Sequence, residues 1–228
     1  MELVIAYKNY SSWSLRPWLL MRVAGIEFDQ RLLPFAHSDA LKEFAAQHDL
    51  LPQVPVLLDQ LLDQEHVIWD SLAIAEYLAE QFPERALWPA DVTLRALARS
   101  ASAEMHSGFM ALRQTFPMNC RAQKQAPTHL ITESVQRDLN RLAVLWARFA
   151  AAKAKHNAEG AFLCGAFSIV DAMYAPVMWR VRGYGLTVSD DFVAWSAAMY
   201  ALPEMQEWLA AAQAETWSMP QYDQVGGA

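Results

Sequence analysis

The period of hydrophobic and polar positions changes once along this chain, near residue 85. Before that point short apolar runs alternate with helical patterns, and after it nearly every segment has helical periodicity. Strands are predicted at four apolar runs, Leu3–Tyr7, Phe28–Leu33, Val56–Leu58 and Val67–Trp69. Helices are predicted between and after them, at Ser12–Ala24, Asp39–Gln47 and residues 71–81. The order βαβαββα favours a mixed four-stranded sheet covered by helices.

The two parts are separated by Gln81–Ala90, which is bracketed by prolines and is typical of an interdomain linker. We therefore expect a first domain at 1–82, a linker at 83–91 and a helical domain at 92–228. Residues 92–115 and 128–155 lack proline and predict helices. Ser168-Ile169-Val170-Asp171 resembles a helix capping box, and Pro176 is expected to kink the helix that follows.

Composition excludes several classes of partner. The chain has 228 residues, is 54% hydrophobic and carries a net charge of -7, which argues against nucleic acid or an anionic membrane as the main partner. No apolar run reaches ~18 residues, so no transmembrane span is expected. The start is short and acidic, which favours a first strand over a signal peptide. Cys120 and Cys164 lack metal-ligand or CxxC spacing, so we expect no metal, no disulfide and a cytoplasmic location.

Two segments about forty residues apart carry the functional signal. In Leu51–Leu57 the Val54-Pro55 step forces extended backbone before a β-branched run, and it is a good place for a cis bond. In Trp69–Leu78 a short strand ends at Asp70 or Ser71, either of which can cap the next helix. Together they predict an exposed backbone edge beside a helix N-terminus, which could hold a small peptide with a carboxylate.

These features together resemble a cytosolic-type glutathione transferase over nearly the whole chain. Tyr10-Ser11-Ser12-Trp13-Ser14-Leu15-Arg16 is similar to the serine-type branches, especially the zeta class. Ala103–Arg113, followed by Pro117-Met118-Asn119, resembles a bacterial branch. The resemblance implies an α/β N-terminal thioredoxin-like domain (βαβαββα) plus an all-α C-terminal domain. It also implies a homodimer that uses glutathione as cosubstrate together with a small electrophile.

The chemistry implied by the resemblance is stabilisation of a thiolate. A free thiol titrates near ~8.5, so a hydroxyl donor and a helix N-terminus that favour the anion would activate it. Ser11 matches the sulfur-facing position of the zeta-like stretch, and Ser12 supports it or takes its place. Ser14 is the rival as helix cap, because Pro17 favours the first turn of a helix. The remaining interpretation is that all three serines only satisfy a helix start.

The resemblance also implies how glutathione would be held. Val54 would pair its backbone with the cysteinyl moiety like an added strand, and a cis Pro55 would present that backbone. Ser71 and the helix N-terminus would take the γ-glutamyl carboxylate, and Asp70 the α-ammonium. Three polar residues are candidates for the glycyl end: Gln53, His37 and Lys42.

The electrophile is expected against the first helix of the second domain. The candidate residues there have helical spacing, namely Met105, His106, Phe109, Met110 and Arg113. Arg113 would bind a carboxylate of an acidic substrate or an interdomain carboxylate. Met and Phe at such positions are more often core, and a single His is usually structural.

Departures from the zeta pattern keep more than one function open. Trp13 stands where that class usually has Cys, and Leu51-Pro52 replaces a Gly/Met-Lys pair. The main prediction is a glutathione transferase activated by a serine hydroxyl. The alternatives are a glutathione-dependent isomerase of the maleylacetoacetate type, or a non-catalytic glutathione- or ligand-binding protein on the same fold. A thiol-disulfide enzyme is disfavoured, because it needs a cysteine where this chain has serines.

Overall fold

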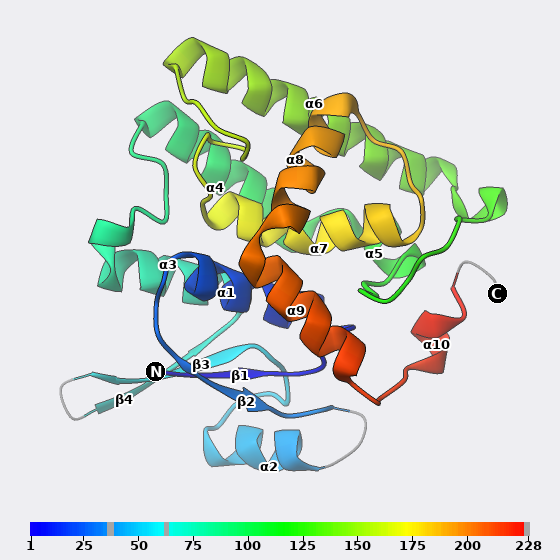
Figure 1. Cartoon of the computed structure of the whole chain (residues 1–228). Helices are drawn as coiled ribbons and strands as arrows, with labels where there is room; N and C mark the ends of the chain where they lie inside the picture. Colours follow the sequence, from blue (N-terminus) through cyan, green and yellow to red (C-terminus); the bar gives the residue numbers. More distant parts are fainter. Residues whose placement is uncertain (36–38, 62–63, 226–228) are drawn as a thin grey trace.

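A computed structural model describes residues 1–35, 39–61 and 64–225 of the chain (Figure 1). Its sheet has four strands in the order β2-β1-β3-β4. The strands are β1 (Glu2–Ile5), β2 (Asp29–Leu32), β3 (Val56–Leu61) and β4 (Gln64–Trp69). β1 runs parallel to β2 and antiparallel to β3, which pairs antiparallel with β4. The predicted mixed sheet is confirmed, with β3 and β4 extending further toward each other than their apolar residues indicated.

Three helices cover this sheet, α1 (Ser12–Val23), α2 (Ala40–Gln47) and α3 (Ser71–Gln81). α1 and α3 lie on one face and α2 lies on the other (Figure 1). Alternate residues of a strand point to opposite faces. Leu3 and Ile5 accordingly join the core under α1, whereas Val4 packs with Leu41 and Phe44 of α2.

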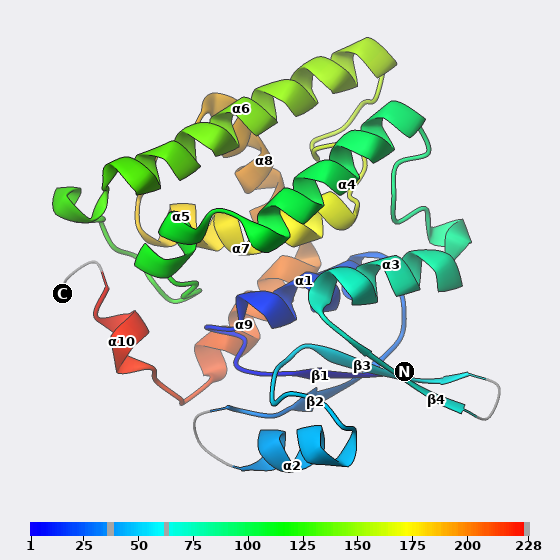
Figure 2. The same ribbon diagram turned by 180° about the vertical axis from the view of Figure 1, so that it is seen from behind.

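The rest of the chain is helical, as predicted (Figure 2). Two 3₁₀ turns are present, η1 (Pro83–Arg85) and η2 (Thr128–Leu130). The α-helices are α4 (Val92–Ser107), α5 (Met110–Thr115), α6 (Glu133–His156), α7 (Ile169–Gly183), α8 (Asp190–Ala201), α9 (Pro203–Ala214) and α10 (Pro220–Asp223). The segment predicted as a linker packs against the rest of the protein, because its residues Leu87 and Trp88 are buried in the main hydrophobic core. Among the described residues, no helix is long and apolar enough to cross a membrane.

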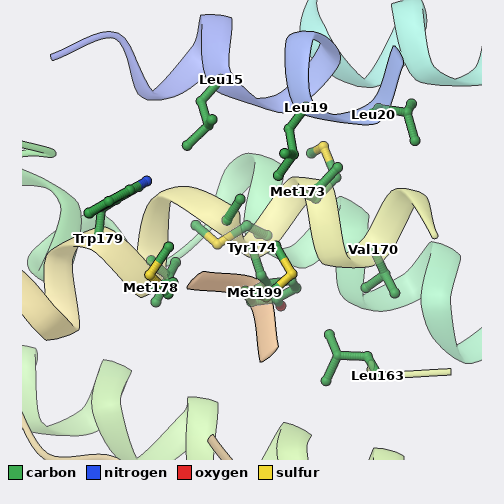
Figure 3. Packing of buried hydrophobic residues seen from close by; sticks show 14 of the residues in the cluster. Leu15, Leu19, Leu20, Leu163, Val170, Met173, Tyr174, Met178, Trp179 and Met199 are labelled. Carbon is green, nitrogen blue, oxygen red and sulfur yellow. The ribbon is translucent and has the colours of Figure 1, made fainter. Parts of the chain in front are cut away.

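Helix α7 is the centre of the helical domain, since nearly all of its residues are buried. Leu15 and Leu19 point from α1 towards α7, and Met173 points back (Figure 3). The predicted cap at its start is present: the Asp171 carboxylate accepts the Ser168 backbone N–H at 3.0 Å and the Trp195 indole N–H at 2.8 Å. The helix continues through Pro176 rather than ending there. The two domains are thus joined by a continuous packed interface between α1 and α7.

The expected helix at 92–115 is wrong in one respect, because it breaks at Gly108. α4 ends there, Phe109 adopts a left-handed conformation with φ 55, and α5 restarts at Met110. A Cβ on Gly108 would lie 2.7 Å from the backbone oxygen of Glu104, so this approach requires glycine. The helical spacing assumed for residues 105–113 therefore does not hold across the break.

Candidate functional site

Two cavities meet at the N-terminus of α1. The larger, of about 620 Å³, lies between α1, the loop before β3 and the start of α3. The smaller, of about 240 Å³, lies between α1, α5 and the C-terminal segment. Ser11, Trp13 and Phe35 line both. The predicted residues Gln53, Val54, Pro55, Asp70 and Ser71 all line the larger cavity.

The three serines of the motif occupy different positions. Ser11 is the N-cap of α1 and lines both cavities, while Ser12 lines only the smaller one. Ser14 is fully buried behind Ser11. Its hydroxyl accepts the Ala6 N–H at 3.1 Å and lies 2.8 Å from the Ser11 hydroxyl. Of the three, Ser14 is therefore the one turned into the protein.

Either hydroxyl could donate in the Ser11–Ser14 bond, and we assign its direction by counting the available partners. A hydroxyl has one proton to donate. Within the described part of the chain, Ser11 is the partner available to the buried Ser14 proton. Ser14 therefore donates to Ser11, which also accepts the Ser14 N–H at 3.4 Å. The Ser11 proton is left to point into the cleft.

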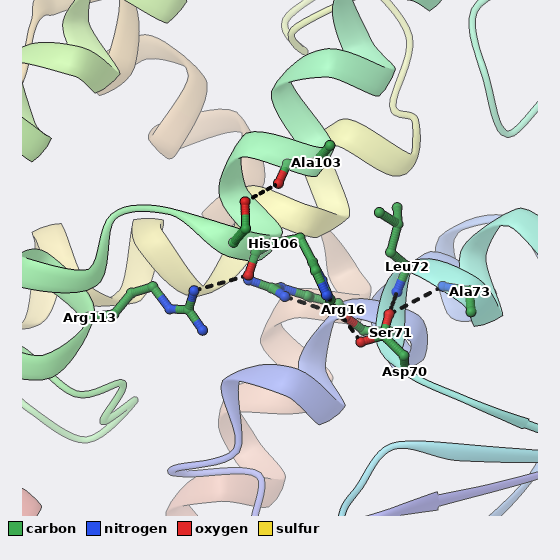
Figure 4. Close-up of polar contacts among 9 residues, drawn as sticks. Arg16, Asp70, Ser71, Leu72, Ala73, Ala103, His106 and Arg113 are labelled. Carbon is green, nitrogen blue, oxygen red and sulfur yellow. Dashed lines mark hydrogen bonds and ion pairs between the residues drawn. The ribbon is translucent and has the colours of Figure 1, made fainter.

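Asp70 and Ser71, at the start of α3, line the larger cavity, and Figure 4 draws their polar contacts. From the sequence, either Asp70 or Ser71 could be the N-cap of α3. In the structure the N-cap is Asp70, whose carboxylate accepts the N–H of Leu72 at 2.8 Å. Asp70 has φ 75, a strained conformation for a residue with a side chain. Ser71 is buried, and its hydroxyl accepts a hydrogen bond of 3.3 Å from Arg16. Among the residues that the structure describes, no acceptor is recorded for the Ser71 proton, which leaves it available to a ligand.

The loop before β3 forms the adjacent wall. The Val54–Pro55 peptide bond is cis, Val54 is half-buried and Gln53 is exposed. The other two candidates for the glycyl end give no support to the prediction. Lys42 is exposed and pairs with Asp39 at 2.9 Å, and His37 lies outside the described residues.

The predicted electrophile residues separate into two groups. Arg113 lines the smaller cavity, and Met110 joins it as an exposed side chain. Met105 and Phe109 do not line either cavity: both are buried in the hydrophobic core, Phe109 against Tyr174. The break at Gly108 explains this correction, because it turns Phe109 inward and brings Arg113 back along the end of α4. The Arg113 guanidinium donates to the carbonyl oxygens of His106 at 3.2 Å and Gly108 at 3.1 Å.

His106 bridges the two domains rather than lining a cavity. Its Nε2 lies 3.2 Å from the Asp70 carboxylate, so α4 contacts the cap of α3 (Figure 4). Its ring stands edge-on to Trp13, with centroids 5.3 Å apart. The Trp13 ring also lies under the guanidinium groups of Arg16 at 4.4 Å and Arg113 at 4.9 Å.

Three arginines give this region a positive charge. None of Arg16, Arg113 and Arg180 forms an ion pair with a carboxylate among the described residues. Burial, followed by the charges of Arg113 and Arg180, lowers the pKa of Arg16 to about 9. Burial and then Arg113 lower the pKa of Arg180 to about 10. Such shifts indicate that an anion bound here would be favoured.

Arg180 and Tyr222, which were not among the candidate site residues from the sequence, also contribute to this site. Arg180 comes from α7, where it donates to the Phe116 carbonyl at 2.9 Å and lines the smaller cavity. Tyr222 of the C-terminal segment lines the same cavity. Within residues 1–35, 39–61 and 64–225 there is no group of His, Cys, Asp and Glu that could hold a metal ion, and Cys120 and Cys164 are buried free thiols.

Comparison with known proteins points to one superfamily. The family model for the glutathione S-transferase N-terminal domain matches residues 10–81. Glutathione S-transferase 1 of Dianthus caryophyllus is 31% identical over 111 residues, which are 49% of this chain and 48% of that protein. A zeta-class glutathione S-transferase of Euphorbia esula is 28% identical over 118 residues, covering 51% of this chain and 50% of that one. The matches thus span about half the length of these relatives.

The likeness of fold extends over almost the whole chain. The crystal structure of a glutathione transferase homolog from Burkholderia gl BGR1, which contains bound glutathione, aligns with a TM-score of 0.66. The alignment covers 94% of this chain and 98% of that one, at 21% sequence identity. The second domain therefore shares the fold of these proteins as well as the first.

Proposed function

Because this chain belongs to the cytosolic glutathione transferase superfamily, whose N-terminal family model matches residues 10–81, we propose that it binds glutathione in the larger cavity and activates the thiol. The bound thiolate attacks the carbon of a small electrophile held in the smaller cavity. The two substrates then meet at Ser11, which lines both cavities.

The observation that carries the proposal is the position of Ser11, which caps α1 and lines both cavities. Its oxygen already accepts from Ser14, so its own O–H is available to donate to a sulfur in the cleft. Lowering a thiol pKa by ~2 units requires roughly 2.7 kcal/mol. A charge-assisted hydrogen bond of ~1.5–3 kcal/mol and a helix terminus of ~0.3–1 kcal/mol supply that amount. Serine stabilises the anion, and the thiol proton leaves to solvent.

Glutathione would lie across three elements of the larger cavity. Val54 would pair its backbone with the cysteinyl moiety. Ser71, whose oxygen already accepts from Arg16, would donate its proton to the γ-glutamyl carboxylate at the start of α3. Asp70 would receive the α-ammonium, and Gln53 would approach the glycyl end.

We propose that the electrophile carries a negative charge. Arg113 and Arg180 line the smaller cavity without a carboxylate partner in the described part of the chain, and Trp13 offers a flat apolar wall between them and Ser11. A carboxylate bound there would recover part of the desolvation cost of the two guanidinium groups.

The positive charge of Arg113 and Arg180 in the smaller cavity also favours a second candidate reaction, isomerisation of an unsaturated acid. There the glutathione sulfur adds to the double bond and leaves again, so glutathione is not consumed. Conjugation consumes one glutathione per product. Measuring the loss of free thiol during turnover distinguishes the two reactions.

Ultraviolet difference titration of bound glutathione tests the proposal. In wild type the thiol is expected to ionise below neutral pH, and Ser11→Ala should raise that midpoint by one to two units (~1.4–2.7 kcal/mol). Ser12→Ala is the matched control and should leave it near the wild-type value. If the bound thiol ionises as in free solution in wild type, the protein holds glutathione without activating it.

The resemblance further implies a homodimer in the cytoplasm, and we include both in the proposal. Light scattering on the purified protein would give the mass of the assembly directly. A monomer at micromolar concentration would contradict the dimer without affecting the thiol chemistry.

A further inference from the structure

The C-terminal segment, residues 215–225, packs on the loop between β1 and α1. The Glu215 carboxylate accepts the backbone N–H groups of Lys8 at 2.7 Å and Asn9 at 3.0 Å. The ring of Trp217 stands edge-on to Tyr7 at 5.5 Å. Parts of the chain more than two hundred residues apart are therefore joined just before the N-cap of α1.

Tyr10 is the centre of this contact. Its hydroxyl donates to the Asp223 carboxylate, at 2.8 Å and 2.9 Å to the two oxygens. It accepts from the Arg121 guanidinium at 2.7 Å and from the Met219 N–H at 3.2 Å. One donated and two accepted bonds fill the capacity of a phenol hydroxyl. The Tyr10 side chain, only 4% exposed, is thus fixed at its outer end.

Asp223 also organises the groups around Tyr10. Its carboxylate accepts from the Asn119 amide at 3.0 Å and from the Met219 N–H at 3.2 Å. Arg121 in turn donates to the carbonyl oxygens of Glu215 and Trp217, each at 3.0 Å. Loss of the Asp223 carboxylate would therefore remove the acceptor of the Tyr10 proton and two bonds that hold Asn119 and Met219 around it.

Tyr10 directly precedes Ser11 in the chain. The backbone turn that presents Ser11 is held by two hydrogen bonds, from Ser11 N–H to the Tyr7 carbonyl at 2.8 Å and from Ser12 N–H to the Tyr10 carbonyl at 3.0 Å. A side chain anchored at one residue restricts the backbone of the next, and a catalytic hydroxyl needs such support to keep its direction.

We propose that Asp223 is a positioning residue for the Ser11 hydroxyl, acting through Tyr10. This inference rests on the proposed role of Ser11 as the donor to the glutathione sulfur. The C-terminal segment is thereby part of the machinery that sets the thiol pKa, although Asp223 is not among the residues that line the two cavities.

The sign of the effect separates positioning from simple electrostatics. Removing a negative charge from this region would by itself favour a nearby thiolate and lower its pKa. Misdirecting the Ser11 hydroxyl has the opposite effect, because the thiolate loses its donor. Asp223→Asn, which keeps the size of the side chain, should therefore raise the pKa of the bound thiol.

The test is ultraviolet difference titration of glutathione bound to the full chain, in wild type, Asp223→Asn, Tyr10→Phe and the double variant. Each single variant should raise the thiol pKa by about 0.5–1 unit, a threefold to tenfold fall in the ionisation constant of the bound thiol. The double variant should lose no more than the larger single effect, because both act through one contact. Asp190→Asn, an exposed carboxylate at the start of α8, is the matched control and should leave the pKa unchanged.

Melting temperatures recorded in parallel identify a purely structural role. If Asp223→Asn melts earlier but leaves the thiol pKa at or below the wild-type value, the inference is overturned. If Asp223→Asn does not fold, Tyr10→Phe alone decides by the same criterion. A wild-type thiol that ionises as in free solution would instead refute the proposed function itself, which keeps the two failures distinguishable.

Discussion

The hydroxyl oxygens of Ser14 and Ser11 lie 2.8 Å apart, the first fully buried and the second at the junction of two cavities. The pair links the Ala6 backbone to the cleft through a chain of two hydroxyls. If Ser14 donates to Ser11, both lone pairs of the Ser11 oxygen are occupied, by the Ser14 hydroxyl and the Ser14 N–H, and the Ser11 proton remains for a ligand. Two residues that the sequence offered as rivals therefore have complementary positions.

Ser14→Ala should affect both stability and thiol ionisation. The Ala6 N–H would lose its acceptor in a buried site, which costs about 1–3 kcal/mol. The Ser11 hydroxyl would lose one donor and its fixed direction, so we expect the pKa of bound glutathione to rise by less than in Ser11→Ala. Urea unfolding and thiol titration measure the two effects separately. A larger rise in Ser14→Ala than in Ser11→Ala would make Ser14 the direct donor.

Arg113→Met should change the preference for charged electrophiles. We expect KM to rise about tenfold for an electrophile with a carboxylate, a loss of ~1.4 kcal/mol, and to stay within about twofold for a neutral electrophile of similar size. Arg113→Lys keeps the charge and serves as control, with a smaller rise. Equal losses for both substrates would mean that Arg113 only supports the end of α4, where it caps two carbonyl groups.

Gly108→Ala should disturb the junction of α4 and α5. The added Cβ would stand 2.7 Å from the Glu104 carbonyl oxygen, and relieving this contact requires the backbone to move. The expected cost is about 1–3 kcal/mol in the free energy of unfolding. Ser107→Ala, in the same turn, should cost much less, because it removes only an exposed bond to Ala103. Equal unfolding midpoints for Gly108→Ala and wild type would contradict this.

The buried Asp171 carboxyl gives a pH dependence of stability. Burial raises its pKa to about 6, although bonds from Leu163, Ser168 and Trp195 favour the charged form. The folded state therefore binds a proton that the unfolded state releases near pH 4. Its contribution to stability is fully present below about pH 4 and is lost as the pH rises to about 6, a change of up to ~3 kcal/mol.

Urea unfolding of wild type and Asp171→Asn between pH 4 and pH 6 measures this contribution. The stability of wild type relative to Asp171→Asn should fall as the pH rises. A constant difference across this range would mean that the carboxyl keeps an ordinary pKa despite its burial. Asp171→Ala should be severely destabilised at every pH, because it leaves several buried donors unpaired.

The strands and helices of the first domain were predictable because their signals are local. The spacing of apolar residues changes from every second residue in the strands to every third or fourth residue in the helices. Asp70 and Ser71 directly precede such a helical pattern, where capping residues are expected. That Asp70 rather than Ser71 is the N-cap of α3 was not predictable. It depends on the backbone of Asp70 adopting φ 75, a conformation that residues with a side chain rarely adopt.

The wall of the smaller cavity was less predictable. Arg180 lies in a largely apolar helix, and its neighbours in sequence do not indicate that Phe116 and Arg113 are nearby. Asp223 reaches Tyr10 across more than two hundred residues, and no periodicity encodes such a contact. Phe109 was misplaced because a pattern drawn over residues 105–113 assumed a continuous helix through Gly108.

The packing of α1 on α7 has a consequence for how substrates enter. The helix that presents Ser11 and the helix that carries Arg180 pack together in one hydrophobic cluster, so the proposed thiolate donor and the proposed anion-binding residue lie on directly packed helices. A hinge between the domains would have to break that core. We therefore expect entry and exit to depend on small movements of the short elements that line the smaller cavity, namely α5 and the last described residues of the chain.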